Sequence, residues 1–171
     1  SKRLIHVFYI TPKDGTEGVM VSDAAVNVVL NEKSKKRATL IVVELLKKIG
    51  IVRPKIAFLS ASESIIESMP STLEGKVLCD WSKANIKGAD FAGPLALDLI
   101  LSRQAAAIKG VKENGVSGRA NGIIVPDIVS GNALFKSLVY LSGGCAAGLV
   151  IGARVPLILT SRADPPAARL A

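Results

Sequence analysis

Residues 122–141 of the chain read GIIVPDIVSGNALFKSLVYL, and this stretch decides the fold class. Its first five residues, 122–126, form a short apolar run that predicts a buried strand. Residues 130–141 then predict a helix that follows the strand after a short loop. A strand followed closely by a helix is the repeating unit of parallel sheets that are covered by helices. The stretch therefore indicates an α/β protein.

Alternation of strands and helices continues on both sides of this stretch. Apolar patterning predicts strands at residues 4–10, 18–22 and 55–60, helices at residues 35–49, 71–82 and 94–107, and further apolar runs at residues 145–151 and 155–160. We expect a three-layer α/β fold with a mainly parallel sheet and helices on both faces. The turn residues Lys13, Asp14 and Gly15 predict that the first two strands form a hairpin, which would add an antiparallel edge to the sheet.

The predicted helices carry local signals as well. One face of the helix at residues 35–49 is apolar and is expected to be buried: Leu40, Val43, Leu46 and Ile49. Four cations near its start are expected to be solvated: Lys33, Lys35, Lys36 and Arg37. Gly50 is expected to end this helix, and Ser71 and Glu74 have the spacing of a capping box at the start of the next one.

The composition limits the class of partner. The 171 residues are 49% hydrophobic but only 4% aromatic, and their net charge is +8. Such a charge indicates an anionic partner, for which nucleic acid, a membrane surface and a phosphorylated metabolite all qualify. The scarcity of aromatic side chains argues against nucleic acid, and the apolar run at residues 146–160 is too short and interrupted to span a membrane. Cys79 and Cys145 form no CxxC pair, which fits a reduced, cytoplasmic protein without a metal site.

The sequence contains neither a GxGxxG nor a GxxxxGK[ST] nucleotide-binding motif. His6, the only histidine, lies inside a predicted strand, so we expect a structural histidine with satisfied hydrogen bonds rather than a catalytic one. Cys145 lies in the small-residue stretch SGGCAAG, where we expect it to serve packing. The residues that could bind a ligand lie instead in loops after predicted strands, at residues 59–63, 126–132 and 160–164.

These loops offer hydroxyl groups, amide donors and cations, which a phosphate site requires. Because parallel strands end at the same edge of a sheet, we expect the three loops to gather there. The candidate substrate-binding residues of the first two loops and the following helix are Ser60, Asp127, Gly131, Asn132 and Lys136. The third loop contributes Ser161, Arg162 and Asp164.

Six short segments extend this pattern over nearly the whole chain. They are VSDAAVN (21–27), LSASE (59–63), MPSTLEG (69–75), GPLALD (93–98), VPDIVSGNALFKSLVYL (125–141) and RVPLILTSRAD (154–164). Together, and in this order, they resemble the phosphate acetyl/butyryl transferase family. The resemblance implies an enzyme that moves an acetyl or butyryl group between coenzyme A and inorganic phosphate, with coenzyme A as a substrate and no cofactor or metal.

The resemblance also implies roles for individual residues. Arg162 would bind phosphate or stabilise the charge that develops on the thioester oxygen, and Ser161 would hydrogen-bond the thioester or the leaving sulfur. Acetyl-transferring members have an acid several residues after the arginine, where this chain has Pro165, Pro166, Ala167 and Ala168. Asp164 is then the candidate general base, an arrangement closer to butyryl-type members.

The resemblance further implies an isocitrate/isopropylmalate dehydrogenase-like fold and a homodimer. Residues 1–171 match the second of two family domains, and residues 149–171 are expected to begin the return to a first domain that the chain lacks. The alternative is a truncated, non-catalytic domain that binds coenzyme A or phosphate. A metal-dependent dehydrogenase on the same fold would need clustered Asp ligands and a nucleotide loop, and we find neither in the sequence.

Overall fold

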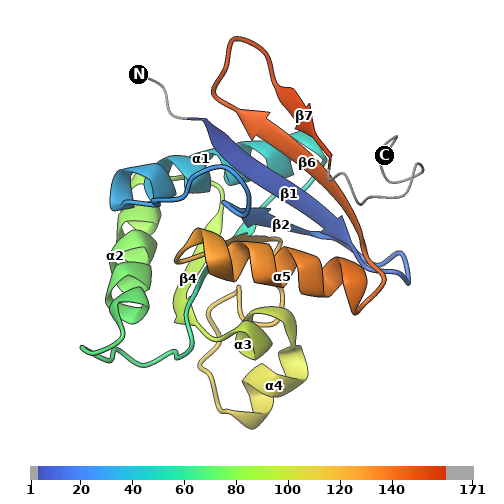
Figure 1. Cartoon of the computed structure of the whole chain (residues 1–171). Coiled ribbons are helices and arrows are strands. Elements are labelled where there is room, and N and C mark those ends of the chain that lie inside the picture. The colour runs from blue at the N-terminus through green and yellow to red at the C-terminus, as the bar shows by residue number, and fades with distance from the viewer. Residues whose placement is uncertain (1–3, 161–171) are drawn as a thin grey trace.

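The computed structural model describes residues 4–160, which form seven strands and five helices (Figure 1). In chain order the elements are β1 (Ile5–Thr11), β2 (Val19–Ser22), α1 (Glu32–Lys48), β3 (Lys55–Leu59), α2 (Pro70–Asn85), β4 (Asp90–Leu95), α3 (Leu97–Leu101), α4 (Arg103–Ile108), β5 (Gly122–Ile124), α5 (Ile128–Tyr140), β6 (Cys145–Ile151) and β7 (Leu157–Leu159). Within the described residues no helix is long and apolar enough to cross a membrane.

The seven strands form one sheet in the order β4-β3-β5-β2-β1-β6-β7. Strands β4, β3, β5 and β2 pair in parallel, whereas β1 is antiparallel to both β2 and β6, and β7 is antiparallel to β6. Five strands therefore share one direction, and β1 and β7 run the opposite way. We call the end of the sheet at which these five strands terminate the carboxyl edge, and the end at which they begin the amino edge. Both differ from the lateral edges of the sheet, which are formed by the outer strands β4 and β7.

Helices cover both faces of this sheet, as the sequence predicted. On one face, α1 and α2 bury a core that includes Val42, Leu46 and Leu78 against Ile56 and Phe58 of β3. On the other face, α3, α4 and α5 bury a second core. Residues of the two cores alternate along the central strands β1, β2, β3 and β5, because successive side chains of a strand point to opposite faces. The result is a mixed, mostly parallel sheet between two helical layers.

The predicted hairpin exists, but it does not lie at the edge of the sheet. Phe8 pairs with Val21 and Ile10 with Val19 across the turn. The pair lies in the interior of the sheet, because β5 adds to β2 on one side and β6 adds to β1 on the other. The prediction of an antiparallel edge was therefore wrong. The apolar run at residues 145–151 supplies the strand that covers β1.

A strand was missed where the sequence predicted a single helix at residues 94–107. Strand β4 carries Gly93 and Pro94, which weaken a strand signal in the sequence. Proline is tolerated there because β4 is the outer strand of the sheet, and a Cβ on Gly93 would lie 2.6 Å from the Cβ of Phe58. The helical part begins only at Leu97 and breaks at Ser102, whose hydroxyl accepts a hydrogen bond from the amide of Ala105 at 3.1 Å.

The buried face of α1 and the start of α2 differ from the prediction. Val43 and Leu46 are buried as expected, but Leu40 and Ile49 are 43% and 52% exposed, because Ala38, Ile41 and Val42 complete the buried face instead. Helix α2 begins at Pro70 without a side-chain cap, so the capping box at Ser71 was wrong. Its Glu74 instead pairs with Lys35 of α1, which is 3% exposed rather than solvated.

His6 is buried as expected, but its hydrogen bonds are not satisfied. Its side chain is fully buried beside the ring of Phe8, with 4.2 Å between the ring centroids. Neither ring nitrogen has a hydrogen-bond partner within the described residues. Burial lowers the pKa of His6 to about 4, against a weaker opposing effect of the nearby Asp23 carboxylate. The neutral imidazole is therefore the form that the fold accommodates.

Candidate substrate-binding site

The two described candidate loops meet at the carboxyl edge, as the sequence predicted. Ser60 follows β3 and Asp127 follows β5, and these two strands are parallel neighbours. The intervening crevice is lined by Lys35, Ser71 and Pro126 among others and has a volume of only about 10 Å³. Such a space holds about one water molecule. The loops therefore lie together, and the crevice between their strand ends is too small for a substrate.

Three candidate residues at the start of α5, namely Asp127, Gly131 and Asn132, have local structural contacts. The carboxylate of Asp127 caps the helix by accepting hydrogen bonds from the amide and hydroxyl of Ser130, at 2.8 and 3.0 Å. The side-chain amide of Asn132 donates to the carbonyl of Ala24 at 3.1 Å. A Cβ on Gly131 would lie 2.8 Å from the carbonyl oxygen of Asp23, so only glycine permits this close approach. These contacts hold α5 against the loop that follows β2.

Ser60 is hydrogen-bonded to neighbouring residues, whereas Lys136 is exposed. The hydroxyl of Ser60 lies 2.8 Å from the hydroxyl of Ser71, and its amide donates to the carbonyl of Leu95 at 2.9 Å. Lys136 is exposed, with its ammonium 5.8 Å from the ring centroid of Phe135 and 5.9 Å from that of Tyr140. At these distances the cation lies near the aromatic faces. Lys136 is thus the most accessible of these candidates, but it lies in the second half of α5, away from the loops at the carboxyl edge.

Asp23 organises the carboxyl edge and was not among the candidate site residues. Its carboxylate is 1% exposed and accepts hydrogen bonds from the amides of His6, Ala25 and Val26 at 3.1, 3.0 and 2.9 Å. A buried carboxylate is stable only when such donors surround it. The signal was available in the segment VSDAAVN, because an aspartate that binds the amides two and three residues later is a common turn.

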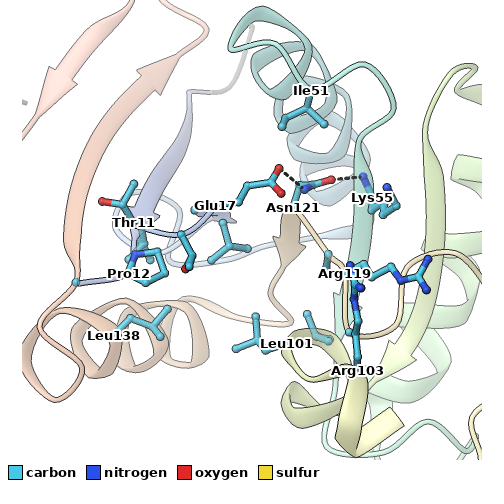
Figure 2. A pocket seen from close by; sticks show the side chains of 18 of the residues that line it. Thr11, Pro12, Glu17, Ile51, Lys55, Leu101, Arg103, Arg119, Asn121 and Leu138 are labelled. Carbon is cyan, nitrogen blue, oxygen red and sulfur yellow. Dashed lines mark hydrogen bonds between the residues drawn. The ribbon is translucent and has the colours of Figure 1, made fainter. Parts of the chain in front are cut away.

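A much larger hollow lies at the opposite, amino edge. It has a volume of about 850 Å³. Its walls come from the ends of β1 and α5, the beginnings of β2, β3 and β5, and the α3–α4 turn (Figure 2). The labelled lining residues in this view are Thr11, Pro12, Glu17, Ile51, Lys55, Leu101, Arg103, Arg119, Asn121 and Leu138. We call this hollow the amino-edge cleft.

Four cations line the amino-edge cleft, and one of them is neutralised. Arg53 binds the carboxylate of Asp90 through two hydrogen bonds of 2.8 and 2.6 Å, which lower the pKa of Asp90 and raise that of Arg53. The side chains of Lys55, Arg103 and Arg119 form no ion pair or hydrogen bond within residues 4–160. The cleft therefore contains three positive charges that are available to an anion.

A buried amide connects the two sides of the cleft. Asn121 is 6% exposed, and its side-chain oxygen accepts a hydrogen bond from the amide of Lys55 at 3.0 Å. Its side-chain nitrogen donates to the carboxylate of Glu17 at 3.0 Å (Figure 2). Glu17 is the one carboxylate among the cleft-lining residues. The cleft was not expected from the sequence, because the candidate loops follow strands, whereas Glu17, Lys55 and Asn121 lie just before or at the start of strands.

The candidate catalytic residues Ser161, Arg162 and Asp164 lie outside the described residues. The strand before them, β7, was expected to be parallel to the others, and this was wrong. Leu157 pairs with Val150 and Leu159 with Gly148, so β7 runs toward the amino edge. The premise that all three candidate loops follow strands of one direction therefore fails for the third loop.

Metal ligands do not cluster in the described part of the chain. Within residues 4–160, no group of three or more His, Cys, Asp or Glu side chains is arranged to hold a metal ion. Both cysteines are free thiols, with Cys79 buried and Cys145 partly buried. Burial raises the pKa of the Cys79 thiol, which disfavours the reactive thiolate.

Comparison with known proteins relates this arrangement to one family. Residues 2–167 match the family model described as phosphate acetyl/butaryl transferase. A phosphate acetyltransferase of Rhizobium meliloti is 40% identical over 99% of the chain, and a phosphate butyryltransferase of Clostridium acetobutylicum is 37% identical over 95%. The crystal structure of a branched-chain phosphotransacylase from Enterococcus faecalis V583 has a TM-score of 0.87 and 33% identity over 95% of the chain.

These alignments cover nearly all of this chain but only about half of each relative. The chain spans 54% of the length of both curated relatives and 58% of the Enterococcus structure. The family match nevertheless extends over nearly all of this chain, including the segment around Ser161. The chain therefore belongs to the phosphate acetyl/butyryl transferase family.

Proposed function

We propose that the protein transfers an acyl group between coenzyme A and inorganic phosphate. The observation that carries the proposal is the family match over residues 2–167, with relatives named both acetyl- and butyryltransferases. Those relatives are enzymes, which favours a catalytic role over a truncated, non-catalytic domain. The positive charge of +8 supports the proposal, because coenzyme A and phosphate are both anionic.

The proposed chemistry is direct attack within a ternary complex. A phosphate oxygen forms a bond to the thioester carbon, the carbon–sulfur bond breaks, and the coenzyme A thiolate leaves and takes a proton. Arg162 stabilises the charge on the thioester oxygen, and Ser161 donates a hydrogen bond to the thioester or the leaving sulfur. In the reverse direction Asp164 accepts the thiol proton. Holding both substrates together supplies much of the rate enhancement, roughly 7–11 kcal/mol of the barrier.

The remaining parts of the proposal concern the whole protein. We expect a homodimer in the cytoplasm that uses coenzyme A as a substrate and needs neither metal nor cofactor. The chain would form the second of two domains, with residues 149–171 beginning the return to the first. The mostly parallel sheet between two helical layers is compatible with an isocitrate/isopropylmalate dehydrogenase-like fold.

Two edges of the sheet compete as the place where substrate binds. The resemblance proposes contacts from Ser60, Asp127, Gly131 and Asn132 at the carboxyl edge and from Lys136 farther along α5. The geometry favours the amino-edge cleft, which has the volume and the available positive charge. The two proposals are distinguished by variants such as Asp127→Ser, which changes the side chain but keeps an oxygen that can cap α5.

Thiol release from acetyl-CoA and butyryl-CoA tests the proposed activity. The full-length protein is assayed with each thioester, with and without phosphate, while a thiol reagent records free coenzyme A. We expect phosphate-dependent release with at least one thioester, together with formation of the acyl phosphate. Release that is absent, or equally fast without phosphate, contradicts the proposed function.

A further inference from the structure

We propose that the amino-edge cleft binds the phosphate groups of a phosphorylated ligand with an apolar body, and that Lys55, Arg103 and Arg119 contact these phosphates. The proposal rests on the proposed function, in which coenzyme A is such a ligand. None of these residues was a candidate from the sequence. They come from three separate segments, at the start of β3, at the start of α4 and in the loop before β5.

The fold brings these three cations to one hollow by backbone packing. Gly118 has a φ of +68°, and a Cβ at this position would collide with the backbone of Arg103. The amide of Gly118 donates to the carbonyl of Leu99 at 2.8 Å. The segment that carries Arg119 is thereby fixed against the turn that carries Arg103. Both arginines lie beside one another on the same side of the cleft (Figure 2).

Lys55 is fixed beside the same segment by Asn121. The amide of Asn121 donates to the carbonyl of Lys55 at 2.8 Å, and the side-chain oxygen of Asn121 accepts from the amide of Lys55. The backbones that carry the three cations are thus held together, whereas their charged groups form no hydrogen bond or ion pair within the described residues. An anion that binds here meets a framework that is already ordered, which lowers the entropic cost of binding.

The charge distribution indicates which part of the ligand contacts which wall. Glu17 repels an anion, so the phosphate groups are expected on the side of Arg103 and Arg119. Apolar lining residues, among them Ile51, Leu101 and Leu138, supply surface for an uncharged body. A volume of about 850 Å³ is in the usual range for small-molecule sites, about 300–1,000 Å³. The cleft therefore suits a ligand that is both polyanionic and partly apolar.

Strand direction connects this cleft with the proposed chemistry. Ser142 and Gly144, which precede β6, line the cleft, so the beginning of β6 lies at this edge. Strand β7 is antiparallel to β6 and runs toward the same edge. Arg162 follows the end of β7 by only a few residues in the sequence. A phosphorylated ligand in the cleft would thus lie at the end of the sheet toward which β7 runs.

Titration calorimetry with three related ligands tests the proposal. Coenzyme A, dephospho-coenzyme A and pantetheine share the pantetheine arm. Dephospho-coenzyme A lacks only the 3′-phosphate, whereas pantetheine lacks every phosphate together with the adenosine. Each is titrated into the full-length wild type and the double variant Arg103→Ala/Arg119→Ala. The matched control is Lys33→Ala/Lys112→Ala, which removes the same charge at two exposed residues that do not line the cleft.

We expect the arginine double variant to weaken coenzyme A binding roughly tenfold or more, the scale of losing charge-assisted hydrogen bonds. Pantetheine binding stays within twofold of the wild type, and the control variant binds all three ligands normally. Arg103→Lys/Arg119→Lys recovers part of the affinity, because charge returns without the planar guanidinium. Thermal melting shows whether each variant is folded.

Two results overturn the proposal. One is an arginine double variant that binds coenzyme A as tightly as the control variant. The other is an equal loss for coenzyme A and pantetheine, because the arginines would then not act on phosphate. The proposed function fails separately, if the wild type binds coenzyme A through these arginines but produces no acyl phosphate.

Discussion

Polar side chains lie at both edges of the sheet, but they are hydrogen-bonded to the protein at the carboxyl edge, whereas three cations at the amino edge are unpaired within the described residues. At the carboxyl edge, Asp23, Asp127 and Asn132 are bound to neighbouring backbone groups, and the remaining crevice holds about one water molecule. At the amino edge, Lys55, Arg103 and Arg119 form no hydrogen bond or ion pair through their side chains within residues 4–160 and surround a cleft of about 850 Å³. Polar residues at a strand end thus indicate a binding site only when their charged groups remain available.

Exposed side chains strengthen the contrast between the edges. Val28, Val29 and Val129 lie at the carboxyl edge and are 77%, 73% and 74% exposed. An apolar surface of this kind suits contact with protein more than with phosphate. The general expectation that ligands bind at the carboxyl ends of strands applies to sheets of uniform direction. Here β1 and β7 run the opposite way, so strand ends of both kinds occur at each edge.

The largest expected effect concerns Arg162, which follows the strand that runs toward the amino edge. Arg162→Ala should lower turnover roughly a hundredfold or more, the usual scale for losing a donor to the transition state. Arg162→Lys should recover only part, and Ser161→Ala should be milder, because a neutral hydrogen bond contributes less than a charged one. Steady-state kinetics of the full-length protein, with phosphate and acyl-CoA varied separately, measure these effects.

Thermal melting supplies the control for this series. An unchanged melting temperature assigns the loss of turnover to catalysis. Near-normal turnover in Arg162→Ala removes the residue from the active site. A large fall in melting temperature would show that Arg162 instead stabilises the fold.

Burial of His6 near the carboxyl edge should make the stability of the fold sensitive to acid. Its pKa is lowered to about 4 in the fold, chiefly by burial, whereas an unfolded histidine titrates near 6.5. The unfolded chain therefore binds the proton more tightly, and stability present above about pH 6.5 is lost as the pH falls toward 4. The loss amounts to roughly 3 kcal/mol at pH 4. His6→Leu should remove this component from urea unfolding curves measured between pH 7 and 4.

The comparison of wild type with His6→Leu isolates this histidine from the carboxylates that titrate in the same range. The difference in unfolding free energy between the two proteins should change with pH in the direction that favours the variant in acid. A difference that stays constant from pH 7 to 4 would show that His6 is protonated equally easily in the folded and unfolded states.

Asp127 tests whether the carboxyl edge has a structural or a substrate-binding role. Asp127→Ala removes the cap of α5 and should lower the unfolding free energy by about 1 kcal/mol, whereas Asp127→Ser keeps a capping oxygen and should restore most of it. If the edge is structural, Asp127→Ser retains kcat/KM within roughly threefold of the wild type. A tenfold or larger kinetic loss in this stable variant would return the substrate to the carboxyl edge.

Glu17 gives the smallest expected effect and tests the charge distribution of the amino-edge cleft. Glu17→Gln removes the one carboxylate among the lining residues and keeps a group that can accept from Asn121. Coenzyme A should bind a few times more tightly, because a like charge has been removed from its surroundings. The gain should shrink at high salt. Weaker binding in this variant would show that Glu17 makes a favourable contact with the ligand, which contradicts the proposed charge distribution.

Much of the fold was predictable because it depends on local patterns. The apolar run before Pro126 and the helix after it gave a correct strand–helix unit, and Gly50 adopts the positive φ expected at the end of α1. Strand β4 was missed because Gly93 and Pro94 obscure its pattern. The position of the hairpin was missed because the pairing of β1 with β6 joins residues that are far apart in the sequence.

The binding site was less predictable for the same reason. The sequence shows that Ser60, Asp127 and Asn132 follow strands, but not that their polar groups are bound to Ser71, Ser130 and Ala24. The pair formed by Lys35 and Glu74 likewise joins two helices that the sequence treats separately. Arg103 and Arg119 meet only through the close approach at Gly118, a contact that no local pattern indicates.

Hydrogen–deuterium exchange with and without coenzyme A tests most directly which edge binds the ligand. Bound ligand protects backbone amides at its site from exchange with solvent. The account predicts coenzyme A-dependent protection of the cleft segments at residues 50–55, 100–104 and 116–121. Peptides covering residues 60–66 and 127–132 should exchange at unchanged rates. Protection confined to residues 60–66 and 127–132 would contradict the account and place the substrate at the carboxyl edge.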